Sequence, residues 1–464
     1  MSSIGKKIQA GQRFVVLGLG VSGRAAMKFL VQQGAQVAVS DTRNFQELAE
    51  EDQEYIRKHS IPFEGGGHSL AFCELCDTVF ISPGIDPEIQ LLQELRNQNK
   101  EVLGELAIAA PYLTETVVAV TGTNGKTTVT ALLGELLQKA GKEVFVGGNI
   151  GTPLLDYLRL GKRAEVLVLE LSSFQLESAG SFSPHIGILL NVTSDHLDRH
   201  GSMVNYTAAK MKLFSHQGKN DIAILCSDDP MCMQVKELLN GQKKYCFGTV
   251  DASCAAHGSA NTFSVHVADE GAFQYSLKGT ALDSYTGLLN SEAAVLAASL
   301  LGCKQHDLQR GLQGFKLARH RLQFVRKRAG VNYYNDSKAT NTGAVKSALA
   351  NFHGDILLIA GGRDKGEEYE QLQSVVQEKV KELILIGEAA NAMDTVLSEY
   401  VHTQRAESMD EAVKMAAELA VAGDTVLLAP ACSSFDMFDN YGQRGDVFMQ
   451  AVLDLPEIKN GWSA

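Results

Sequence analysis

Residues 122–128, Gly-Thr-Asn-Gly-Lys-Thr-Thr, constrain the fold of this chain more than any other segment. Residues 116–121 before them are β-branched or small and apolar, which predicts a buried strand. A helix is expected after them, ending near Ala140. In a strand–turn–helix of this kind, the backbone N–H groups of the turn point inward and form an anion-binding nest at the positive end of the helix. The sequence therefore predicts a phosphate loop inside an α/β domain.

The residue types in this turn indicate that its ligand is a nucleoside triphosphate. We expect Lys126 to reach the β- and γ-phosphates and Thr127 to offer its hydroxyl to Mg²⁺. The match to a full Walker A motif is incomplete, because Val120 stands where its first glycine would be. A tight turn could also carry Gly-Lys-Thr by chance, but strand, turn, lysine and helix all agree. The expected phosphate contacts are Gly122, Thr123, Asn124, Gly125, Lys126, Thr127 and Thr128.

Short β-rich apolar runs alternate with helical patterns along most of the 464 residues. At roughly 150 residues per domain, this length predicts about three domains. We expect an α/β protein with three domains in series: a Rossmann-like domain at 1–112, a central P-loop ATPase domain with a mainly parallel sheet at 113–318, and a C-terminal Rossmann-like domain at 319–464. Residues 263–277 alternate in polarity, which predicts an antiparallel hairpin at a sheet edge.

The composition excludes several classes of protein. A formal net charge of −12 argues against a generic nucleic-acid binder. No apolar stretch approaches the roughly 20 residues of a membrane span, and the N-terminal segment does not resemble a signal peptide, so we expect no membrane association and a cytoplasmic location. Cys73 and Cys76 form the only C-x-x-C pair, and we interpret the cysteines as reduced thiols without a metal.

Polar side chains follow two further strand patterns. Residues 166–170 form a buried strand pattern that ends in Glu170, and a later strand leads into residues 191–198, Asn-Val-Thr-Ser-Asp-His-Leu-Asp. In an open α/β sheet, ligands bind at the carboxyl ends of the strands. Glu170 is therefore a candidate Mg²⁺ ligand, and His196 lies at the same edge. A lone Asp or His there would usually be a helix cap or a loop residue, but the clustering beside a phosphate loop favours a function.

Taken in order, these motifs resemble those of the Mur ligase family, ATP-dependent amide-forming enzymes of bacterial cell-wall synthesis. The resemblance covers nearly the whole chain. It rests on residues 122–128, 148–151 (Gly-Asn-Ile-Gly), 170–177 (Glu-Leu-Ser-Ser-Phe-Gln-Leu-Glu), 191–198, 335–341 (Asn-Asp-Ser-Lys-Ala-Thr-Asn) and 430–434 (Pro-Ala-Cys-Ser-Ser).

The resemblance implies a reaction and a division of labour among the domains. The first domain would hold the UDP part of the substrate, the second ATP and the third an amino acid. Residues 336–341 and 173–177 are similar to the branch that adds D-glutamate to UDP-N-acetylmuramoyl-L-alanine. The carboxylate would be activated as an acyl phosphate, with ADP and phosphate released. Two Mg²⁺ ions, small-molecule substrates and a monomeric enzyme are implied.

The resemblance also implies the catalytic residues. The metal ligands would be Thr127, Glu170 and His196. Lys210 aligns with a lysine that the family carbamylates with CO₂, which would turn an ammonium that repels Mg²⁺ into an anionic ligand. From the residues alone Lys210 reads as an ordinary surface lysine, as Lys212 does.

In the first domain, Gly18-x-Gly20-x-x-Gly23 with Asp41 after it matches a dinucleotide fingerprint, whose bare interpretation is NAD binding. The resemblance reassigns the turn to the diphosphate of UDP and Asp41-Thr-Arg to the uracil end. The implied contacts of the UDP substrate are Gly18, Gly20, Ser22, Gly23, Asp41, Thr42, Arg43, Ser82, Pro83, Gly84 and Asn149.

The family pattern assigns the remaining candidates mainly to the third domain. Lys338 would be catalytic, Arg321 and Asp336 would face ATP, and Asn290 would reach adenine. The D-glutamate ligands would be Thr340, Lys365, Ser434 and Tyr441, although the family often has Phe where Tyr441 stands. One departure concerns adenine: Leu289 and Ala293 replace the His and the second Asn of the family's His-Asn-x-x-Asn sequence.

Three alternatives remain open at this point. A nicotinamide-dependent dehydrogenase would explain the first domain but neither the phosphate loop nor Glu170. A sister ligase for another amino acid, or an enzyme similar to folylpolyglutamate synthase, differs in the amino acid that stimulates ADP release. A non-catalytic nucleotide-binding protein would show no amino-acid-stimulated ATP hydrolysis.

Overall fold

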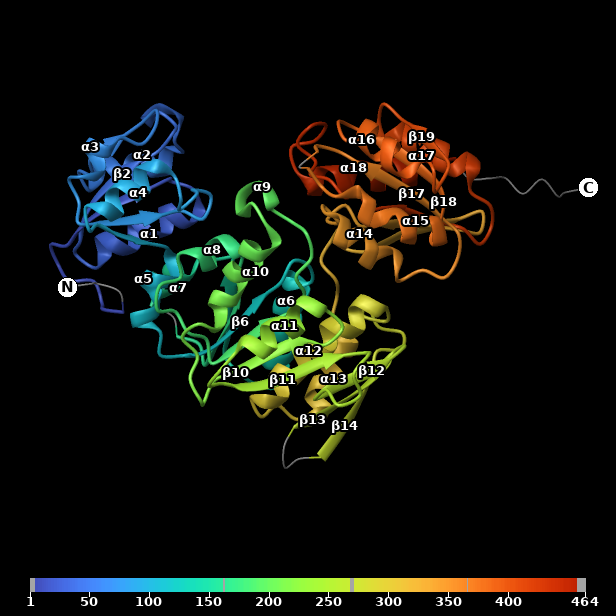
Figure 1. Cartoon of the computed structure of the whole chain (residues 1–464), viewed down its shortest axis with the longest axis horizontal. Coiled ribbons are helices and arrows are strands. Elements are labelled where there is room, and N and C mark those ends of the chain that lie inside the picture. The colour runs from blue at the N-terminus through green and yellow to red at the C-terminus, as the bar shows by residue number, and fades with distance from the viewer. Residues whose placement is uncertain (1–4, 162, 268–270, 365, 457–464) are drawn as a thin grey trace, which may run out of the picture.

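The computed structural model describes residues 5–161, 163–267, 271–364 and 366–456. The chain forms three α/β domains in series, and in Figure 1 the blue N-terminal and the orange-to-red C-terminal domains both stand on the green and yellow central domain. Within the described residues, the strands form sheets of five, nine and six strands. The predicted fold class is confirmed.

The N-terminal domain is a parallel sheet in the order β3-β2-β1-β4-β5. Serine is a preferred N-cap residue, so the sequence predicts that Ser22 caps the first helix. That prediction was wrong, because α1 begins at Val21 with Gly20 as N-cap and Ser22 already lies in the first turn. Gly34 follows the C-cap Gln33 with a φ of +79°, as expected of a glycine that ends a helix. The elements are β1 Arg13–Leu17, α1 Val21–Gln32, β2 Gln36–Ser40, η1 Phe45–Glu47, α2 Glu50–Lys58, β3 Phe63–Glu64, α3 Leu70–Cys73, β4 Thr78–Ile81, α4 Gln90–Asn97, β5 Glu101–Leu103, α5 Glu105–Ala109 and η2 Ala110–Tyr112.

The central domain is built on a sheet in the order β14-β13-β12-β11-β10-β9-β6-β8-β7. Strands β7 to β12 and β6 pair in parallel, and β13 and β14 add the antiparallel edge hairpin that the sequence predicted. The elements are β6 Thr116–Thr121, α6 Lys126–Lys139, β7 Val144–Gly148, α7 Leu154–Leu160, β8 Val166–Glu170, α8 Ser173–Glu177, β9 Ile186–Leu189, α9 Leu197–His200, α10 Met203–Met211, η3 Lys212–Phe214, β10 Ile222–Cys226, α11 Pro230–Leu238, β11 Lys243–Gly248, β12 Ala256–Ser259, β13 Thr262–Val267, β14 Gly271–Ser276, α12 Tyr285–Leu300 and α13 Gln305–Gly314.

The C-terminal domain has a sheet in the order β15-β16-β20-β17-β18-β19, in which only the β15–β16 pair is antiparallel among the described residues. The elements are β15 Gln323–Arg328, β16 Val331–Asn335, α14 Thr342–Leu349, β17 Ile356–Gly361, η4 Tyr369–Leu372, α15 Gln373–Lys379, β18 Val380–Ile386, α16 Ala390–Leu397, β19 Thr403–Arg405, α17 Met409–Leu419, β20 Thr425–Leu428 and α18 Tyr441–Asp454.

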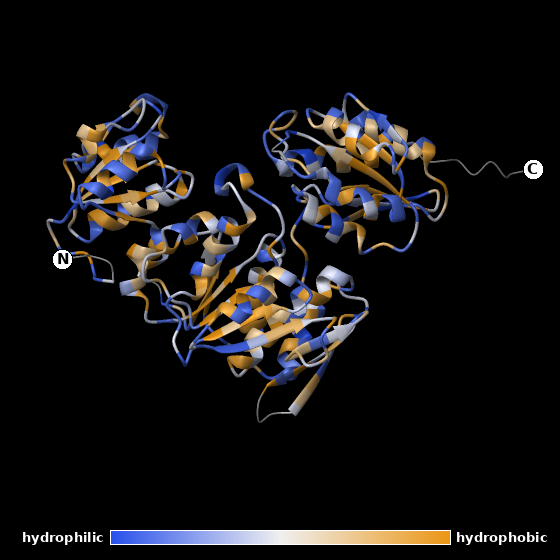
Figure 2. Cartoon of the chain, in the orientation of Figure 1, coloured by the Kyte–Doolittle hydropathy of each residue, from blue (hydrophilic) through white to orange (hydrophobic). Residues whose placement is uncertain are grey.

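The clusters of buried hydrophobic side chains are shared unequally among the three domains. One continuous cluster of buried side chains runs from the N-terminal into the central domain, where Leu106 and Ile108 on α5 belong to the same cluster as Leu154 and Leu155 on α7. The C-terminal domain has separate clusters on the two faces of its sheet. Figure 2 shows its strands as hydrophobic between more polar helices. The first two domains therefore share a core, and the third has its own.

Candidate active site between the central and C-terminal domains

The phosphate loop adopts the geometry that the sequence predicted. β6 ends at Thr121, and α6 begins at Lys126 with Gly125 as a left-handed N-cap at φ +85°. A Cβ on Gly125 would lie 2.7 Å from Oδ1 of Asn290, so a larger residue would displace a side chain of the site. Thr123 N–H donates to the carbonyl of Asn191 at 3.0 Å, and Asn124 N–H donates to its Oδ1 at 2.8 Å. The segment after β9 thus holds the loop from the side.

Two lysines share one carbonyl oxygen of this loop. Lys126 Nζ donates to the carbonyl oxygens of Gly122 at 2.9 Å and Thr123 at 2.7 Å, and Lys210 Nζ donates to that of Gly122 at 2.9 Å. Lys210 lies on α10 with 1% of its surface exposed, and its Nζ is 4.4 Å from the centre of the Tyr206 ring. Burial, and then the charge of Lys126, lower the pKa of Lys210 far below its ordinary value. Lys210 is therefore no surface lysine.

The carboxylate of Glu170 lies at the end of β8 and acts electrostatically on Lys126. Its Oε1 accepts from Nδ2 of Asn149 at 2.8 Å, and its buried Oε2 has no hydrogen-bond partner among the described residues. Burial lowers the pKa of Lys126, and the charges of Glu170 and Asp195 oppose that effect. A buried carboxylate oxygen without a donor is a fitting ligand for a cation such as Mg²⁺.

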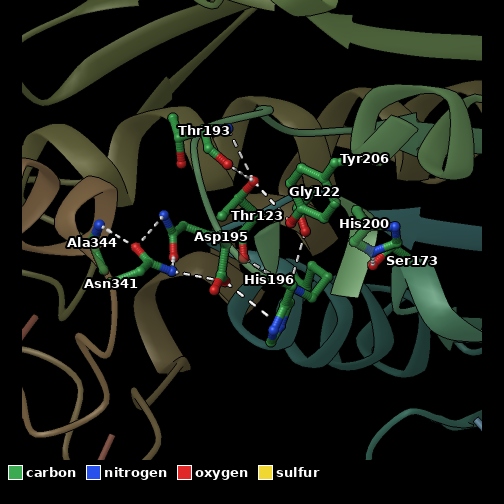
Figure 3. Close-up of polar contacts among 12 residues, drawn as sticks. Gly122, Thr123, Ser173, Thr193, Asp195, His196, His200, Tyr206, Asn341 and Ala344 are labelled. Atoms are coloured by element: carbon green, nitrogen blue, oxygen red, sulfur yellow. Dashed lines mark hydrogen bonds and ion pairs between the residues drawn. The ribbon is translucent and has the colours of Figure 1, made fainter. Parts of the chain in front are cut away.

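His196 reaches the site from an unusual backbone position. Its φ of +56° lies in the left-handed region, at the N-cap of α9. Its Nε2 lies 3.7 Å from Oδ2 of Asp195, and its ring centre is 4.9 Å from that of Phe174. Figure 3 shows His196 and Asp195 on the same side of the loop residues Gly122 and Thr123. A strained backbone that presents an imidazole to a polar cavity is a feature of functional sites.

Asn341 joins the C-terminal domain to the phosphate loop. Its Nδ2 donates to Oδ2 of Asp195 at 3.0 Å, and its Oδ1 accepts from Nδ2 of Asn124 at 3.3 Å (Figure 3). The same Oδ1 accepts from Ala344 N–H at 2.7 Å, which caps α14. One side chain therefore starts a helix of one domain and binds two residues of another.

A cavity of about 670 Å³ opens where the two domains meet. It brings together most of the catalytic and D-glutamate candidates that the sequence analysis named. Its lining includes Thr123, Asn124, Gly125, Lys126, Thr127, Asn149, Glu170, His196, Lys210, Arg321, Lys338, Thr340, Ser434 and Tyr441. Lys365 lies outside the described residues.

A second, narrower pocket continues from this cavity past the phosphate loop. Asn124, Gly125, Arg321 and Lys338 line both spaces. The second pocket also contains Thr128, Asn290 and Asp336, together with the apolar side chains of Leu289, Leu190 and Phe247. An extended ligand could therefore place an apolar ring in the second pocket and an anionic tail in the first.

The C-terminal wall of the cavity is rigidly supported. Nζ of Lys338 lies 3.9 Å from the centre of the Tyr441 ring. Burial raises the pKa of Asp336 to about 7, although Arg321 opposes this. Behind them, the fully buried Arg444 donates to the carbonyl oxygens of Ser337 at 2.9 Å and Cys432 at 3.1 Å. Arg444 thus ties the loop that carries Lys338 to the loop that carries Ser434.

Two candidates for the UDP substrate have other contacts in this structure. The carboxylate of Asp41 accepts from Leu19 N–H at 2.6 Å and from Nε of Arg43 at 2.8 Å, so it holds the glycine turn of the first domain. Burial opposes its ionisation, but these hydrogen bonds lower the pKa of Asp41 to about 2. Asn149 lies in the central domain, where its Nδ2 donates to Oε1 of Glu170.

The glycine turn itself is tightly packed. Ser82 Oγ donates to the carbonyl of Gly18 at 2.7 Å. A Cβ on Gly23 would lie only 1.9 Å from that carbonyl oxygen. A residue larger than glycine would therefore displace the first turn of α1. All the UDP candidates, Asp41 and Asn149 included, stay predictions.

Sequence reasoning missed several residues of the site, three of which bind the phosphate loop directly. Tyr206 bonds to Thr123 at 3.2 Å between their hydroxyls and packs on Lys210, and Asn191 and Asn341 bind the phosphate loop. Tyr206 and Lys210 are four residues apart on a helix, a spacing that places both on one face. That spacing was the available signal for Tyr206. The partners of the two asparagines are distant in sequence and leave no local pattern.

Comparison with known proteins identifies the class to which this fold and site belong. The sequence models for the Mur ligase MurD-like N-terminal domain, the Mur ligase middle domain and the Mur ligase glutamate ligase domain match residues 12–104, 120–295 and 320–432. The chain belongs to the Mur ligase family.

Two similar curated relatives are named for the same activity. The chain is 49% identical over 451 residues to the UDP-N-acetylmuramoylalanine–D-glutamate ligase of Desulfotalea psychrophila, an alignment that covers 97% of this chain and 98% of the relative. It is 40% identical to the enzyme of the same name from Geobacter metallireducens, with 96% and 98% covered.

Solved structures share the fold at lower identity. A pseudomurein peptide ligase type C from Methanothermus fervidus superposes with a TM-score of 0.61 at 19% identity, covering 96% of this chain and all of that one (100%). MurF ligase from Thermotoga maritima, in complex with ADP, gives a TM-score of 0.58 at 20% identity, with 97% and 96% covered. Among the described residues, no helix combines the length and apolarity that a membrane crossing requires.

Proposed function

We propose that this chain is an ATP-dependent ligase that joins D-glutamate to UDP-N-acetylmuramoyl-L-alanine. The observation that carries the proposal is one cavity in which Lys126, Glu170 and Lys210 of the central domain face Thr340 and Ser434 of the C-terminal domain. Such a cavity can hold a nucleoside triphosphate and an amino acid at once. The names of the relatives over almost the whole chain supply the substrates.

The reaction needs the substrate carboxylate to gain a leaving group, because a free carboxylate does not form an amide at neutral pH. We infer that the γ-phosphoryl group of ATP is transferred to it, giving an acyl phosphate that the amine of D-glutamate attacks. The approach of a carboxylate to a triphosphate must be screened by cations. Lys126 at the loop supplies one such charge, and Arg321 and Lys338 in the cavity wall supply others.

Glu170, His196 and Thr127 are the residues that would hold Mg²⁺, and two ions are proposed. The unpartnered Oε2 of Glu170 supports this assignment. When bound, the metal neutralises charge on the phosphates. We further propose that the protein works as a monomer in the cytoplasm. Two domains of one chain complete the cavity, which supports the monomer.

Lys210 is proposed to carry a CO₂-derived carbamate. Its lowered pKa favours the neutral amine, which is the form that attacks CO₂; the N–C bond forms as the amine loses a proton. The product is an anion at a place where an ammonium would repel a nearby metal ion. Its position beside the loop carbonyl of Gly122 supports this role.

The test is phosphate release by the purified protein with ATP, Mg²⁺ and UDP-N-acetylmuramoyl-L-alanine, scanning D- and L-amino acids. Release stimulated by D-glutamate and by no L-amino acid is expected. Stimulation by another amino acid would make the protein a sister ligase. ATP binding without stimulated release would make it a non-catalytic nucleotide-binding protein.

A further inference from the structure

A cluster of two thiols and a carboxylate lies at the turn between β11 and β12 of the central domain, apart from the cavity described above. Cys246 is on β11, Cys254 lies two residues before the start of β12 at Ala256, and Asp251 lies in the turn between the two cysteines. One ligand atom of each lies within 4.8 Å of the other two. Both cysteines are buried, with 8% and 3% of their surfaces exposed.

The spacing of these atoms is close to that of a metal site. Tetrahedral zinc with Zn–S bonds of about 2.3 Å separates two sulfur ligands by about 3.8 Å. Starting from at most 4.8 Å, the ligand atoms need to approach by no more than about 1 Å. Side-chain rotations alone can supply such a movement.

The turn that carries Asp251 is held in place by its own hydrogen bonds. Oδ1 of Asp251 accepts from Ser253 N–H at 2.9 Å and from its hydroxyl at 2.7 Å. Cys254 N–H donates to the carbonyl of Asp251 at 3.1 Å. Asp228 fixes the beginning of the turn, where Thr249 N–H and Oγ1 donate to its Oδ2 at 3.0 and 2.6 Å. Little conformational freedom would therefore be lost on binding an ion.

The charges around the cluster also balance for a divalent ion. Two thiolates and one carboxylate carry three negative charges, which a divalent cation reduces to one. The ammonium of Lys236 on α11 interacts electrostatically with both Cys246 and Asp251 and offsets that remainder. Sulfur ligands favour thiophilic ions, and the carboxylate oxygen favours borderline Zn²⁺ over softer Cu⁺.

We propose that Cys246, Asp251 and Cys254 bind a thiophilic divalent transition metal ion, best matched by Zn²⁺, with a fourth position open to water. The site is separate from the magnesium-binding residues of the proposed reaction. Phe247, the residue after Cys246, lines the narrower pocket beside the phosphate loop. A bound ion would therefore fix the strand end that forms one wall of that pocket.

The test uses Co²⁺ as a spectroscopic probe on the full-length protein, reduced and kept without oxygen. One Co²⁺ per chain with thiolate-to-cobalt charge-transfer absorption in the near-ultraviolet is expected, displaced by an equivalent of Zn²⁺. Cys246→Ser/Cys254→Ser should lose the band. The matched control Cys73→Ser/Cys76→Ser, which removes the buried pair of the first domain, should keep it.

Two further measurements keep the proposal open to refutation if the double variant folds poorly. Asp251→Asn, in a partly exposed turn, should weaken Co²⁺ binding by at least about tenfold while leaving the fold intact. Zn²⁺ should raise the Tm of the unaltered protein and not that of the cysteine variant. The proposal is overturned by fully reduced protein that shows no charge-transfer band, or by an equal band in the cysteine variant. A Cys246–Cys254 disulfide in protein that binds no Co²⁺ after reduction would assign the pair to redox chemistry instead.

Discussion

The carbonyl oxygen of Gly122 accepts hydrogen bonds from Lys126 and Lys210, each at 2.9 Å. The two side chains come from α6 and α10, 84 residues apart in sequence numbering, and meet at the first residue of the phosphate loop. Two ammonium groups at one oxygen repel each other, which is part of the reason that the pKa of Lys210 is lowered. The loop therefore brings together, at one oxygen, the lysine proposed to bind phosphate and the lysine proposed to carry the carbamate.

Replacing Lys126 with alanine should abolish turnover and leave binding of the UDP substrate nearly intact. The loss in kcat should be at least about 10²–10³-fold, because a charge aimed at the transferred phosphoryl group is removed. Steady-state kinetics and calorimetric titration with the UDP substrate measure the two effects. Lys139→Ala, exposed near the other end of α6, is the control. Near-normal kcat in Lys126→Ala would show that another residue binds the phosphates.

Lys210→Ala should nearly silence the enzyme, because it removes the proposed anionic ligand. Small carboxylic acids at high concentration should restore part of the activity by filling the gap. Chloride at the same ionic strength should not, since it acts through screening alone. Lys212→Ala is the matched control, because that exposed ammonium bonds only to the carbonyl of Glu177 among the contacts described, at 2.8 Å. Normal activity of Lys210→Ala without added acid would refute the carbamate.

In the amino-acid pocket, Ser434→Ala should raise the KM for D-glutamate more than the KM for ATP. Ser434 is buried and lines the cavity on the side of the C-terminal domain. Loss of a contact made equally in the ground and transition states weakens binding of that substrate alone. Initial-rate kinetics with each substrate varied in turn provide the measurement, with exposed Ser374→Ala on α15 as control. A selective loss of ATP affinity would place Ser434 at the other substrate.

Substitution of Asn341 should separate its two structural roles. Asn341→Ser keeps an oxygen that can cap α14 but is too short to reach Asp195, whereas Asn341→Ala loses both contacts. Both variants should lower kcat about tenfold or more, because the domains are no longer aligned. Only the alanine variant should also lose about 1 kcal/mol of unfolding free energy. Urea unfolding and kinetics measure the two quantities. Unchanged kcat in Asn341→Ser would mean that its contact with the central domain does not align the site.

Glu105 on α5 predicts a pH dependence of stability. Its Oε1 accepts from Leu155 N–H at 3.1 Å at the start of α7, and burial raises the pKa of Glu105 from 4.5 to about 7. A carboxyl group whose pKa is higher in the folded than in the unfolded state stabilises the folded protein while it is protonated. This stabilisation is lost as the pH rises and the group ionises. The unfolding free energy should therefore fall as pH rises from about 4.5 through about 7, by about 3 kcal/mol in total.

Glu105→Gln should remove this contribution. The unfolding free energy of the variant, compared with that of the unaltered protein, should therefore improve from pH 5 to pH 8. Most of the effect of about 3 kcal/mol lies in this pH range. Urea unfolding at the two pH values is the measurement. Exposed Glu54→Gln on α2 is expected to show no such improvement. An equal pH dependence in Glu105→Gln and the unaltered protein would mean that this carboxyl does not control the transition.

Local pattern was enough to predict the elements that build the site. The phosphate loop, the strand that ends in Glu170 and the edge hairpin at β13 and β14 follow from alternation, glycine and β-branched residues within a few positions. The N-cap of α1 was predicted wrongly because Ser is usually the better cap, whereas here Gly20 precedes the first turn and Ser22 lies inside it.

Contacts between distant segments could not be read from pattern. Asn191 binds the loop and Asn341 binds Asp195, so both contacts join segments that are separated by many elements. Both asparagines stand in segments that carried the family resemblance, but nothing in those segments names the partner of either side chain. The turn after β7 brings Asn149 to Glu170, a contact that its expected role at the UDP substrate did not predict. The burial of Lys210, which changes its chemistry, likewise depends on the packing of α10 and leaves no trace at neighbouring positions.

The unequal division of the hydrophobic cores determines when each part of the site is assembled. Because the N-terminal and central domains share one cluster, folding itself fixes the glycine turn of the first domain relative to the phosphate loop. The C-terminal domain is attached at the cavity through polar contacts such as those of Asn341, which can exchange for water at little net cost. Folding thus fixes the relative position of the first two domains. The position of the third can be selected by the ligands that lie in the cavity between it and the central domain.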